Sequence, residues 1–123
     1  MTGVNILLVG LGSAVGALLR YVISQQINKV NNRDFPWSTF LINMCGSFLL
    51  GLLFQELTVL HHQPNWWLVL GTGFCGSFTT FSTMSVEMVQ LYKRHFLLGT
   101  VYVGSSLALG FLLAWLPRLW LPL

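Results

Sequence analysis

The chain has 123 residues, of which 54% are hydrophobic and only 7% are charged. Because a soluble domain carries about a quarter charged residues, this composition excludes an ordinary water-soluble protein, and its hydrophobicity excludes intrinsic disorder. The formal net charge of +3 rests on six mostly scattered basic residues, without the clustered basic face that nucleic-acid binding needs. We therefore expect a membrane protein surrounded by lipid, with no nucleic-acid partner.

The apolar pattern predicts four membrane-spanning helices. A membrane helix takes about 20 apolar residues, and four such segments fit into the chain with short polar loops between them. Pro36 is typical of the first turn of a helix, and Trp37 of a membrane interface. No linker divides the chain, so residues 1–123 are predicted to form one all-α domain in the cell (plasma) membrane. The predicted helices are Asn5–Ile27, Ser38–Leu60, Leu68–Tyr92 and Phe96–Trp115.

Small residues recur at helical spacing in these segments. Gly12 and Gly16 form a G-x-x-x-G pair, and small residues four positions apart also occur in the second and fourth segments. In lipid, helices associate where small residues let their backbones approach closely. The pattern therefore predicts tight helix packing, within one chain or with a partner.

The third segment carries the most concentrated chemistry. Residues 71–85 contain three glycines and seven hydroxyl side chains, and glycine with β-branched threonine lowers helix stability. We predict that this helix breaks at mid-membrane, near Gly76–Thr80. The free carbonyls of a broken helix can hold a cation, and its free amides favour an anion. The alternative is a continuous helix in which each hydroxyl bonds back to a carbonyl one turn earlier.

The polar groups expected within the membrane suit an anion, because ring edges and O–H or N–H donors can together replace its hydration shell. We expect the Asn43 side chain either to bind an ion or to form a hydrogen bond between helices. Arg20 either attracts anions into a vestibule or pairs with Glu87 or with helix carbonyls. The other groups are Ser82, Thr83, Ser85, Ser105, Ser106, Tyr102 and the phenylalanines at 74, 78 and 81.

These motifs resemble the Fluc (CrcB) family of fluoride channels. The resemblance rests on GALLRY at Gly16–Tyr21, on Asn43 with Gly46, and most specifically on GFCGSFTTFST at Gly73–Thr83, with Glu87 following. It spans all four predicted segments. It implies a passive channel that exports the fluoride trapped in the cytoplasm after HF has entered, and that so confers fluoride resistance.

The resemblance also implies an assembly and a set of site residues. The assembly is an antiparallel, dual-topology dimer that encloses two narrow fluoride pores and one structural Na⁺ ion, which is not transported. The main-chain carbonyls of Gly76 and Thr79 would hold the Na⁺, and Arg20 would border the aqueous entrance. The side chains implied to line the fluoride path are those of Asn43, Phe81, Ser82, Thr83, Met84, Tyr102 and Ser106.

The sequence departs from the family pattern at two places. Met84 stands where the family usually has a second phenylalanine. Methionine lacks the electropositive ring edge, although its flexible side chain can fill the space. On the fourth segment, Gly110 interrupts the track of hydroxyl groups one turn beyond Ser106.

The basic residues favour one orientation in the membrane. Lys29, Arg33, Lys93 and Arg94 fall in the two loops on one side, whereas the other side has Arg118. Counting positive charges places those two loops in the cytoplasm. The dimer partner is then either a second copy of the chain or a homologue that inserts in the opposite orientation.

Other functions fit the residues less well. A small multidrug-resistance exporter also has four helices, but proton-coupled export needs a carboxylate within the membrane, ordinarily in the first helix. The first segment has Arg20 and no acidic residue. An enzyme would need a nucleophile with a base, or metal ligands, within a span, so the chain is not expected to be an enzyme. A non-transporting scaffold would leave the hydroxyl-rich break unexplained.

Overall fold

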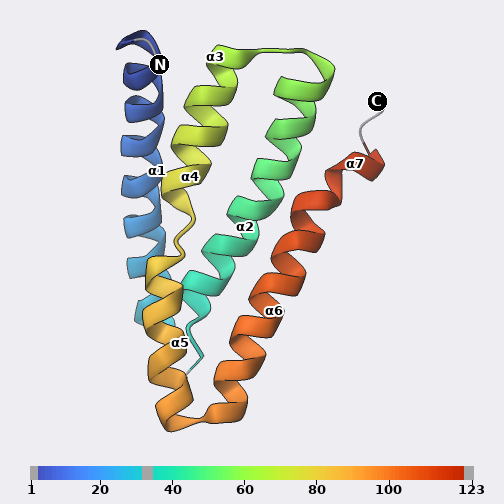
Figure 1. The fold of residues 1–123 in the computed structure, drawn as a ribbon. Coiled ribbons are helices and arrows are strands. Elements are labelled where there is room, and N and C mark those ends of the chain that lie inside the picture. The colour runs from blue at the N-terminus through green and yellow to red at the C-terminus, as the bar shows by residue number, and fades with distance from the viewer. Residues whose placement is uncertain (1–2, 32–34, 121–123) are drawn as a thin grey trace.

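A computed structural model describes residues 3–31 and 35–120 of the chain, and the described elements are all helical (Figure 1). Two long helices come first, and the second continues into a π-helix. They are α1 (Gly3–Val30), α2 (Trp37–Phe54) and η1 (Gln55–Leu60). The next stretch is helical from Pro64 to Phe78 and again from Ser82 to Arg94. Its elements are α3 (Pro64–Trp66), the π-helix η2 (Trp67–Cys75), α4 (Gly76–Phe78) and α5 (Ser82–Arg94). The chain ends with α6 (Phe96–Trp115) and α7 (Pro117–Trp120).

Prolines mark three of the helix ends, as the sequence indicates. Pro36 immediately precedes α2, Pro64 begins α3, and α6 ends at Trp115, two residues before Pro117. Proline has no N–H to donate and a fixed φ, so it fits the first turn of a helix and interrupts a longer one. The expected loop between the first two helices includes residues 32–34, which lie outside the described residues.

The helices run back and forth along a common direction, so that α1 begins and α7 ends at the same end of the bundle (Figure 1). The α1 helix packs mainly against η2 and α4, whereas α6 packs against α2 and α5. The two helical pieces on either side of residues 79–81 therefore have different neighbours. Before the interruption the chain follows α1, and after it the chain follows α6.

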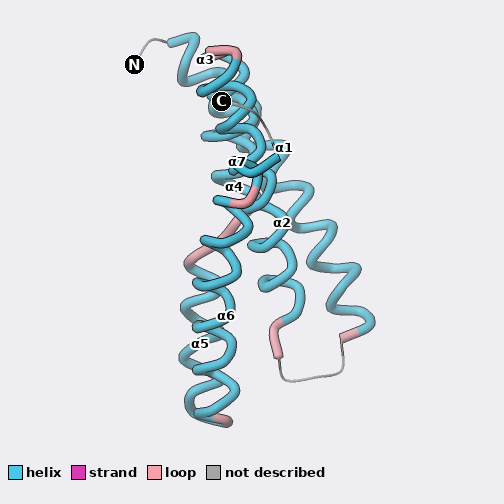
Figure 2. The backbone as a smooth tube through the Cα atoms, turned by 90° about the vertical axis from the view of Figure 1, so that its right-hand side faces the viewer, coloured by secondary structure: helices cyan, strands magenta, loops and turns pink. Residues whose placement is uncertain are grey.

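This change of neighbour divides one end of the bundle into two legs. Figure 2 shows α1 and α2 in one leg and α5 and α6 in the other, with a widening gap between them toward the loops. Each leg is a helix pair in contact, α1 with α2 and α5 with α6. We call the space between the legs the fork.

Close backbone contacts hold α1 against the third stretch. A Cβ atom added at Gly12 would collide with the carbonyl group of Val69, and one at Gly16 with the carbonyl oxygen of Phe74. Ser77 Oγ donates a hydrogen bond of 2.8 Å to the carbonyl oxygen of Ser13. The predicted G-x-x-x-G contact therefore exists within the chain, between α1 and η2–α4.

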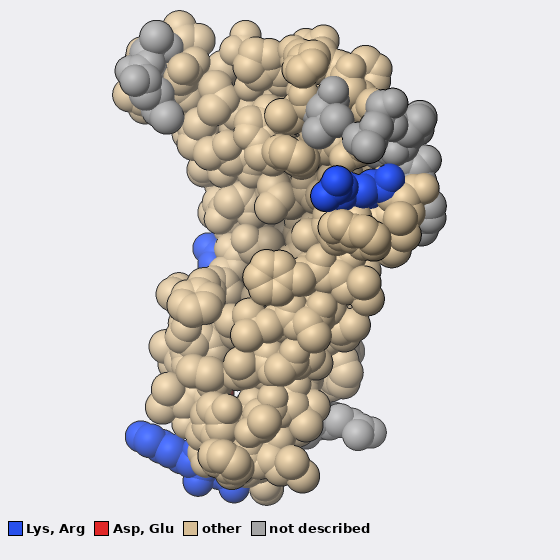
Figure 3. Space-filling view, turned by 45° about the vertical axis from the view of Figure 1, so that its right-hand side comes forward, with Lys and Arg blue, Asp and Glu red and all other residues tan. Residues whose placement is uncertain are grey.

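Three helical stretches of the described residues are long and apolar enough to cross a membrane: Gly3–Val30, Trp37–Thr58 and Phe96–Leu119. Large apolar side chains on the outer face of α1 recur every three or four residues and are exposed: Val4, Leu7, Leu11, Val15 and Leu18. On the face shown in Figure 3, uncharged side chains cover most of the surface, and the few basic groups are separated from one another, with one group at the lower end of the bundle. The prediction of an all-α fold with helices fit for a membrane is confirmed.

Candidate functional site

The third helical stretch is interrupted at Thr79–Phe81. Thr79 has an extended backbone with φ −77° and ψ 156°, and helix geometry resumes at Phe81 with φ −89° and ψ −35°. The predicted interruption is therefore present, and it begins at the C-terminal end of the expected Gly76–Thr80 range. The sequence left a continuous helix open as an alternative, and the structure excludes it.

Asn43 of α2 holds the interrupted backbone by two hydrogen bonds. The N–H of Thr80 donates to Asn43 Oδ1 at 2.8 Å, and Asn43 Nδ2 donates to the carbonyl oxygen of Thr80 at 3.0 Å. A backbone N–H or C=O left unpaired away from water costs about 1–3 kcal/mol. The side-chain amide thus replaces the helix partners that Thr80 has lost.

The hydroxyl of Thr80 organises the start of α5. Thr80 Oγ1 accepts a hydrogen bond of 3.3 Å from the N–H of Thr83, and it donates one of 3.2 Å to Thr83 Oγ1. The first N–H groups of a helix have no partner within the helix, so this hydroxyl acts as a cap. Thr80 is buried, with 9% of its surface exposed.

These two side chains change the partners of two carbonyls. In a continuous helix, the N–H groups of Thr80 and Thr83 would bond to the carbonyls of Gly76 and Thr79. Here the N–H of Thr80 goes to Asn43, and that of Thr83 goes to Thr80 Oγ1. The carbonyls of Gly76 and Thr79 have therefore lost their ordinary helical donors.

A groove of about 330 Å³ runs beside the interruption, between α2 and α6. Its walls are mainly apolar, with a few polar groups from α2, from the interruption and from α6. Five of the residues proposed from the sequence meet in it. They are Asn43, Thr79, Phe81, Met84 and Ser106.

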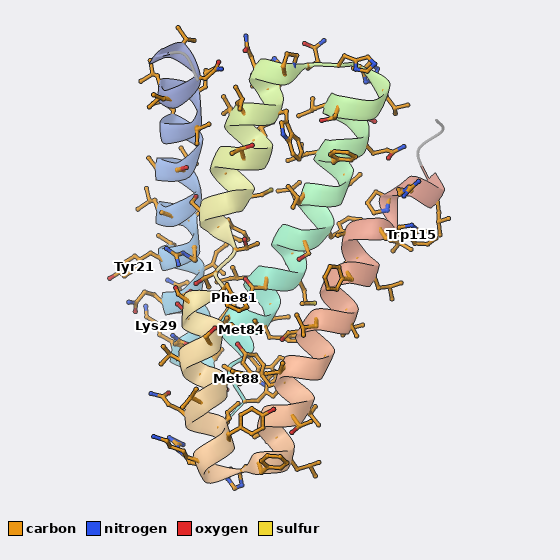
Figure 4. The ribbon with its side chains drawn as sticks, viewed as in Figure 1. Tyr21, Lys29, Phe81, Met84, Met88 and Trp115 are labelled. Atoms are coloured by element: carbon orange, nitrogen blue, oxygen red, sulfur yellow. The ribbon has the colours of Figure 1, made fainter. Side chains whose placement is uncertain are left out.

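Phe81 and Met84 have different surroundings in this groove. Phe81 is 74% exposed, whereas Met84 is 8% exposed and packs in a cluster with Tyr102 and Leu91. In Figure 4, Phe81 lies at the interruption, and Met84 and Met88 follow it down α5 on the side that faces α6. A large exposed ring in the lining of an apolar groove is a contact surface without a partner in the single chain.

The other proposed residues lie outside the groove lining. Ser82 and Thr83 begin α5 and are exposed. Tyr102 is fully buried and packs edge-on against Phe35, with ring centroids 5.3 Å apart. Gly76 is exposed, and Arg20 is half-buried on α1. The single chain therefore gathers only part of the proposed path.

Thr39 and Glu87 were not among the site residues proposed from the sequence. Thr39 Oγ1 donates a hydrogen bond of 2.6 Å to Glu87 Oε1, which joins α2 to α5. A signal for Thr39 exists in the sequence, because Thr39, Asn43 and Ser47 are spaced four residues apart and form a polar stripe on one face of α2. The pairing with Glu87 has no local signal, since the two residues are 48 positions apart.

The fold and the site define a multi-pass helical membrane protein with an interrupted helix at the centre of its bundle. The family described as CrcB-like protein, Camphor Resistance (CrcB), matches residues 7–117, and the chain belongs to this family.

Curated relatives cover nearly the whole chain. A protein of Listeria innocua named "Fluoride-specific ion channel FluC 1" is 46% identical over 114 residues, which are 92% of this chain and 93% of that protein. A "Fluoride-specific ion channel FluC 2" of Bacillus thuringiensis is 42% identical, with the same two coverages of 92% and 93%. A "Fluoride-specific ion channel FluC" of Acidobacterium capsulatum is 44% identical and covers 88% of both chains.

Proposed function

We propose that this chain forms a passive, fluoride-selective channel that exports fluoride from the cytoplasm and so confers fluoride resistance. The observation that carries the proposal is an interrupted helix beside a groove, in a chain 46% identical to a protein named a fluoride-specific ion channel. Fluoride enters cells as neutral HF and is trapped inside as the anion. A membrane potential that is negative inside drives the anion outward through any selective passive path.

The groups in the groove suit an anion. Asn43 Nδ2 carries two hydrogens and uses one of them on Thr80, so the other can be donated to a passing ion. Ser106 Oγ is buried without a hydrogen-bond partner. The exposed ring of Phe81 offers its electropositive edge. Together these donors supply contacts that a desolvated fluoride ion needs.

The channel is proposed to be an antiparallel dimer of subunits with four crossings each. The third crossing would consist of α3, η2 and α4 followed by α5, and its interruption would lie at mid-membrane, buried by the second subunit as lipid requires. The groove is open on one side, where Phe81 is 74% and Phe111 75% exposed. A second subunit seated on these rings would close the groove into a pore.

A structural Na⁺ ion is proposed at the centre of this dimer, on the carbonyls of Gly76 and Thr79. The chemistry fits, because both carbonyls have lost their helical donors and oxygen ligands suit a hard cation. A Cβ added at Gly76 would meet nothing within 4 Å, so this backbone faces open space in the single chain. The ion would bind the subunits together without being transported.

Replacing Na⁺ with N-methylglucamine during purification tests this cation site. We expect the dimer to dissociate, or its melting temperature to fall, and Na⁺ to restore both in a saturable manner. A dimer equally stable with and without Na⁺ would show that these carbonyls hold no structural sodium.

The alternative of a small multidrug-resistance exporter finds no support in α1. That mechanism needs a carboxylate in the first helix to exchange protons for a cationic drug, and α1 contains no acidic residue between Gly3 and Val30. The carboxylates among the described residues are Glu56 and Glu87, on η1 and α5. A charged drug would therefore meet no counter-charge on α1.

Anion efflux from liposomes that contain the purified chain tests the proposed function. We expect rapid fluoride loss, read with a fluoride electrode, and no chloride loss under the same conditions. This result would also show that the chain suffices as a homodimer. If both anions are retained, the next step is to purify the chain from its native cells together with any homologue bound to it. A complex that also releases no fluoride from liposomes would refute the proposed fluoride channel.

A further inference from the structure

A second, polar pocket of about 200 Å³ lies in the fork between the two legs. One wall comes from the end of α1 and the segment before α2, and includes Asn28 and Asn31. The other wall is α5, with Glu87, Gln90 and Arg94. This pocket is distinct from the apolar groove, because its lining is rich in amides and charged groups.

Glu87 occupies the inner part of this pocket. Its carboxylate is half-buried and accepts the 2.6 Å hydrogen bond from Thr39, a residue only 4% exposed. Among the described residues the other carboxylate is Glu56, which lies on η1 and pairs with His61 at 3.2 Å. Glu87 is therefore the acidic side chain nearest the centre of the described bundle.

A row of hydroxyl groups connects Glu87 with the groove. Tyr102 is fully buried, and its hydroxyl lies beside Thr39, the residue that donates to Glu87. Ser106, one turn further along α6, is buried without a hydrogen-bond partner and lines the groove. A buried hydroxyl without a partner calls for a ligand or water, and the hydroxyls of Tyr102 and Ser106 follow one face of α6 from Glu87 toward the groove.

We propose that Glu87 is an electrostatic gate between the fork pocket and the groove, whose negative charge limits the rate at which anions pass. This inference rests on the proposed channel function. An anion that moves from the fork to Tyr102 passes the carboxylate, and like charges a few ångströms apart repel each other strongly where water is scarce. Protonation of Glu87 removes the repulsion and leaves an O–H that donates to the anion.

Among the described residues that line the pocket, Arg94 is the charged group besides Glu87. Thr39 from α2 and the amides of Asn28 and Asn31 from α1 are uncharged. Tyr102 from α6 is a phenol, and Arg94 lies two turns further along α5 itself. Arg33 and Asp34, in the segment that precedes Phe35, lie outside the described residues. The uncharged groups cannot compensate a change in the charge of Glu87, so we expect a passing anion to feel that change.

Fluoride currents across planar bilayers test the gate, because neutral HF carries no current. The variants are Glu87→Gln, whose Oε1 can still accept from Thr39, and Glu56→Gln, which removes a carboxylate from η1. At pH 8 we expect Glu87→Gln to raise the current at least roughly fivefold, the factor that one unit charge at about 4 Å has even in a water-like medium. Lowering the pH to 5.5 should raise the wild-type and Glu56→Gln currents and leave that of Glu87→Gln unchanged.

A second pair of variants keeps the proposal testable if Glu87→Gln does not fold. Gln90 is exposed and lines the same pocket, so Gln90→Lys should raise the current and Gln90→Glu should lower it. The gate is wrong if Glu87→Gln, eluting as a folded dimer, carries no more current than wild type, or if neither Gln90 variant changes the current. Absence of any fluoride current from the wild type, both alone and co-purified with its homologues, would instead refute the proposed channel itself.

Discussion

Asn43 shows how one side chain can satisfy two interpretations. The sequence left two roles open for Asn43, that of an ion ligand and that of a hydrogen-bonding residue between helices. In the structure its amide bonds to both backbone groups of Thr80, and it also lines the groove. One amide hydrogen remains for a ligand, so the structural contact positions the group that would meet the ion.

Asn43→Ala is expected to abolish fluoride efflux and to destabilise the protein. It leaves the N–H and C=O of Thr80 without partners, at about 1–3 kcal/mol for each group. Efflux from liposomes and the melting temperature of the purified dimer are the measurements. The matched control is Cys45→Ser, an exposed position two residues away on α2, which should behave as wild type. An Asn43→Ala protein with wild-type efflux would show that the two bonds are dispensable.

The hydroxyl groups of residues 71–85 have individual roles that their number conceals. Thr79 Oγ1 bonds back to the carbonyl of Cys75 at 2.9 Å, and Ser85 Oγ to that of Phe81 at 2.9 Å. These are the bonds of the continuous-helix alternative, and they form on both sides of the interruption. Among them, Thr80 is the residue whose hydroxyl caps α5 and whose backbone N–H and C=O bond to Asn43.

Thr80→Val should remove the cap of α5 and keep the two hydrogen bonds between Asn43 and the backbone of residue 80. Valine keeps the size and branching of threonine but removes the oxygen that accepts from the N–H of Thr83. Loss of a helix cap costs about 1 kcal/mol, so we expect a modestly lower melting temperature and reduced efflux. Thr100→Val, at an exposed hydroxyl that bonds back to Phe96, serves as the control. Equal melting temperatures of the two variants would refute the capping role.

At the scale of elements, the interruption lets one stretch of chain serve two neighbours. Before it, η2 and α4 lie against α1, where glycines allow backbones to touch. After it, α5 lies against α6. A straight helix would keep one neighbour along its length, so the fork and its polar pocket depend on the interruption.

Glycines on α1 provide a paired test of this packing. A Cβ at Gly12 would collide with the carbonyl of Val69, whereas one at Gly10 would meet nothing within 4 Å. We expect Gly12→Ala to destabilise the protein by about 1–3 kcal/mol, the cost of overpacking. Gly10→Ala should be neutral or stabilising by up to about 1 kcal/mol, because alanine favours helix. Thermal unfolding in detergent measures both, and equal effects would refute the close contact.

At the scale of the whole molecule, basic residues are unequally distributed between the two ends. Lys29 is in the last turn of α1, and Lys93 and Arg94 are in the last turn of α5, at the forked end. Arg118 lies on α7 at the opposite end. Positive residues are retained in the cytoplasm, so the forked end is predicted to face the cytoplasm, and an antiparallel partner would have to insert the other way.

Cysteine labelling in intact native cells tests this orientation. In a chain with Cys45→Ser and Cys75→Ala, single cysteines are placed at Asn65 and at Phe96, exposed positions at opposite ends. An impermeant maleimide should label the Asn65→Cys variant and spare the Phe96→Cys variant. Equal labelling of both would show that the chain inserts in both orientations and needs no homologue as partner.

The sequence by itself determined the features that depend on hydropathy and local backbone chemistry. These include the long apolar helices, the helix ends at the prolines, the glycine contact of α1 and the region of the interruption. The length of an apolar segment, the N–H that proline lacks and the Cβ that glycine lacks have the same effect in any fold. The sequence alone therefore reveals them.

Only the tertiary structure decided which groups meet. The interruption lies at Thr79–Phe81 because Asn43, 37 positions away from Thr80, supplies its hydrogen bonds. Tyr102 is buried against Phe35 and lies outside the groove, and Thr39 pairs with Glu87 across 48 positions. Such pairings depend on how the helices are placed relative to one another, and no local pattern encodes that placement.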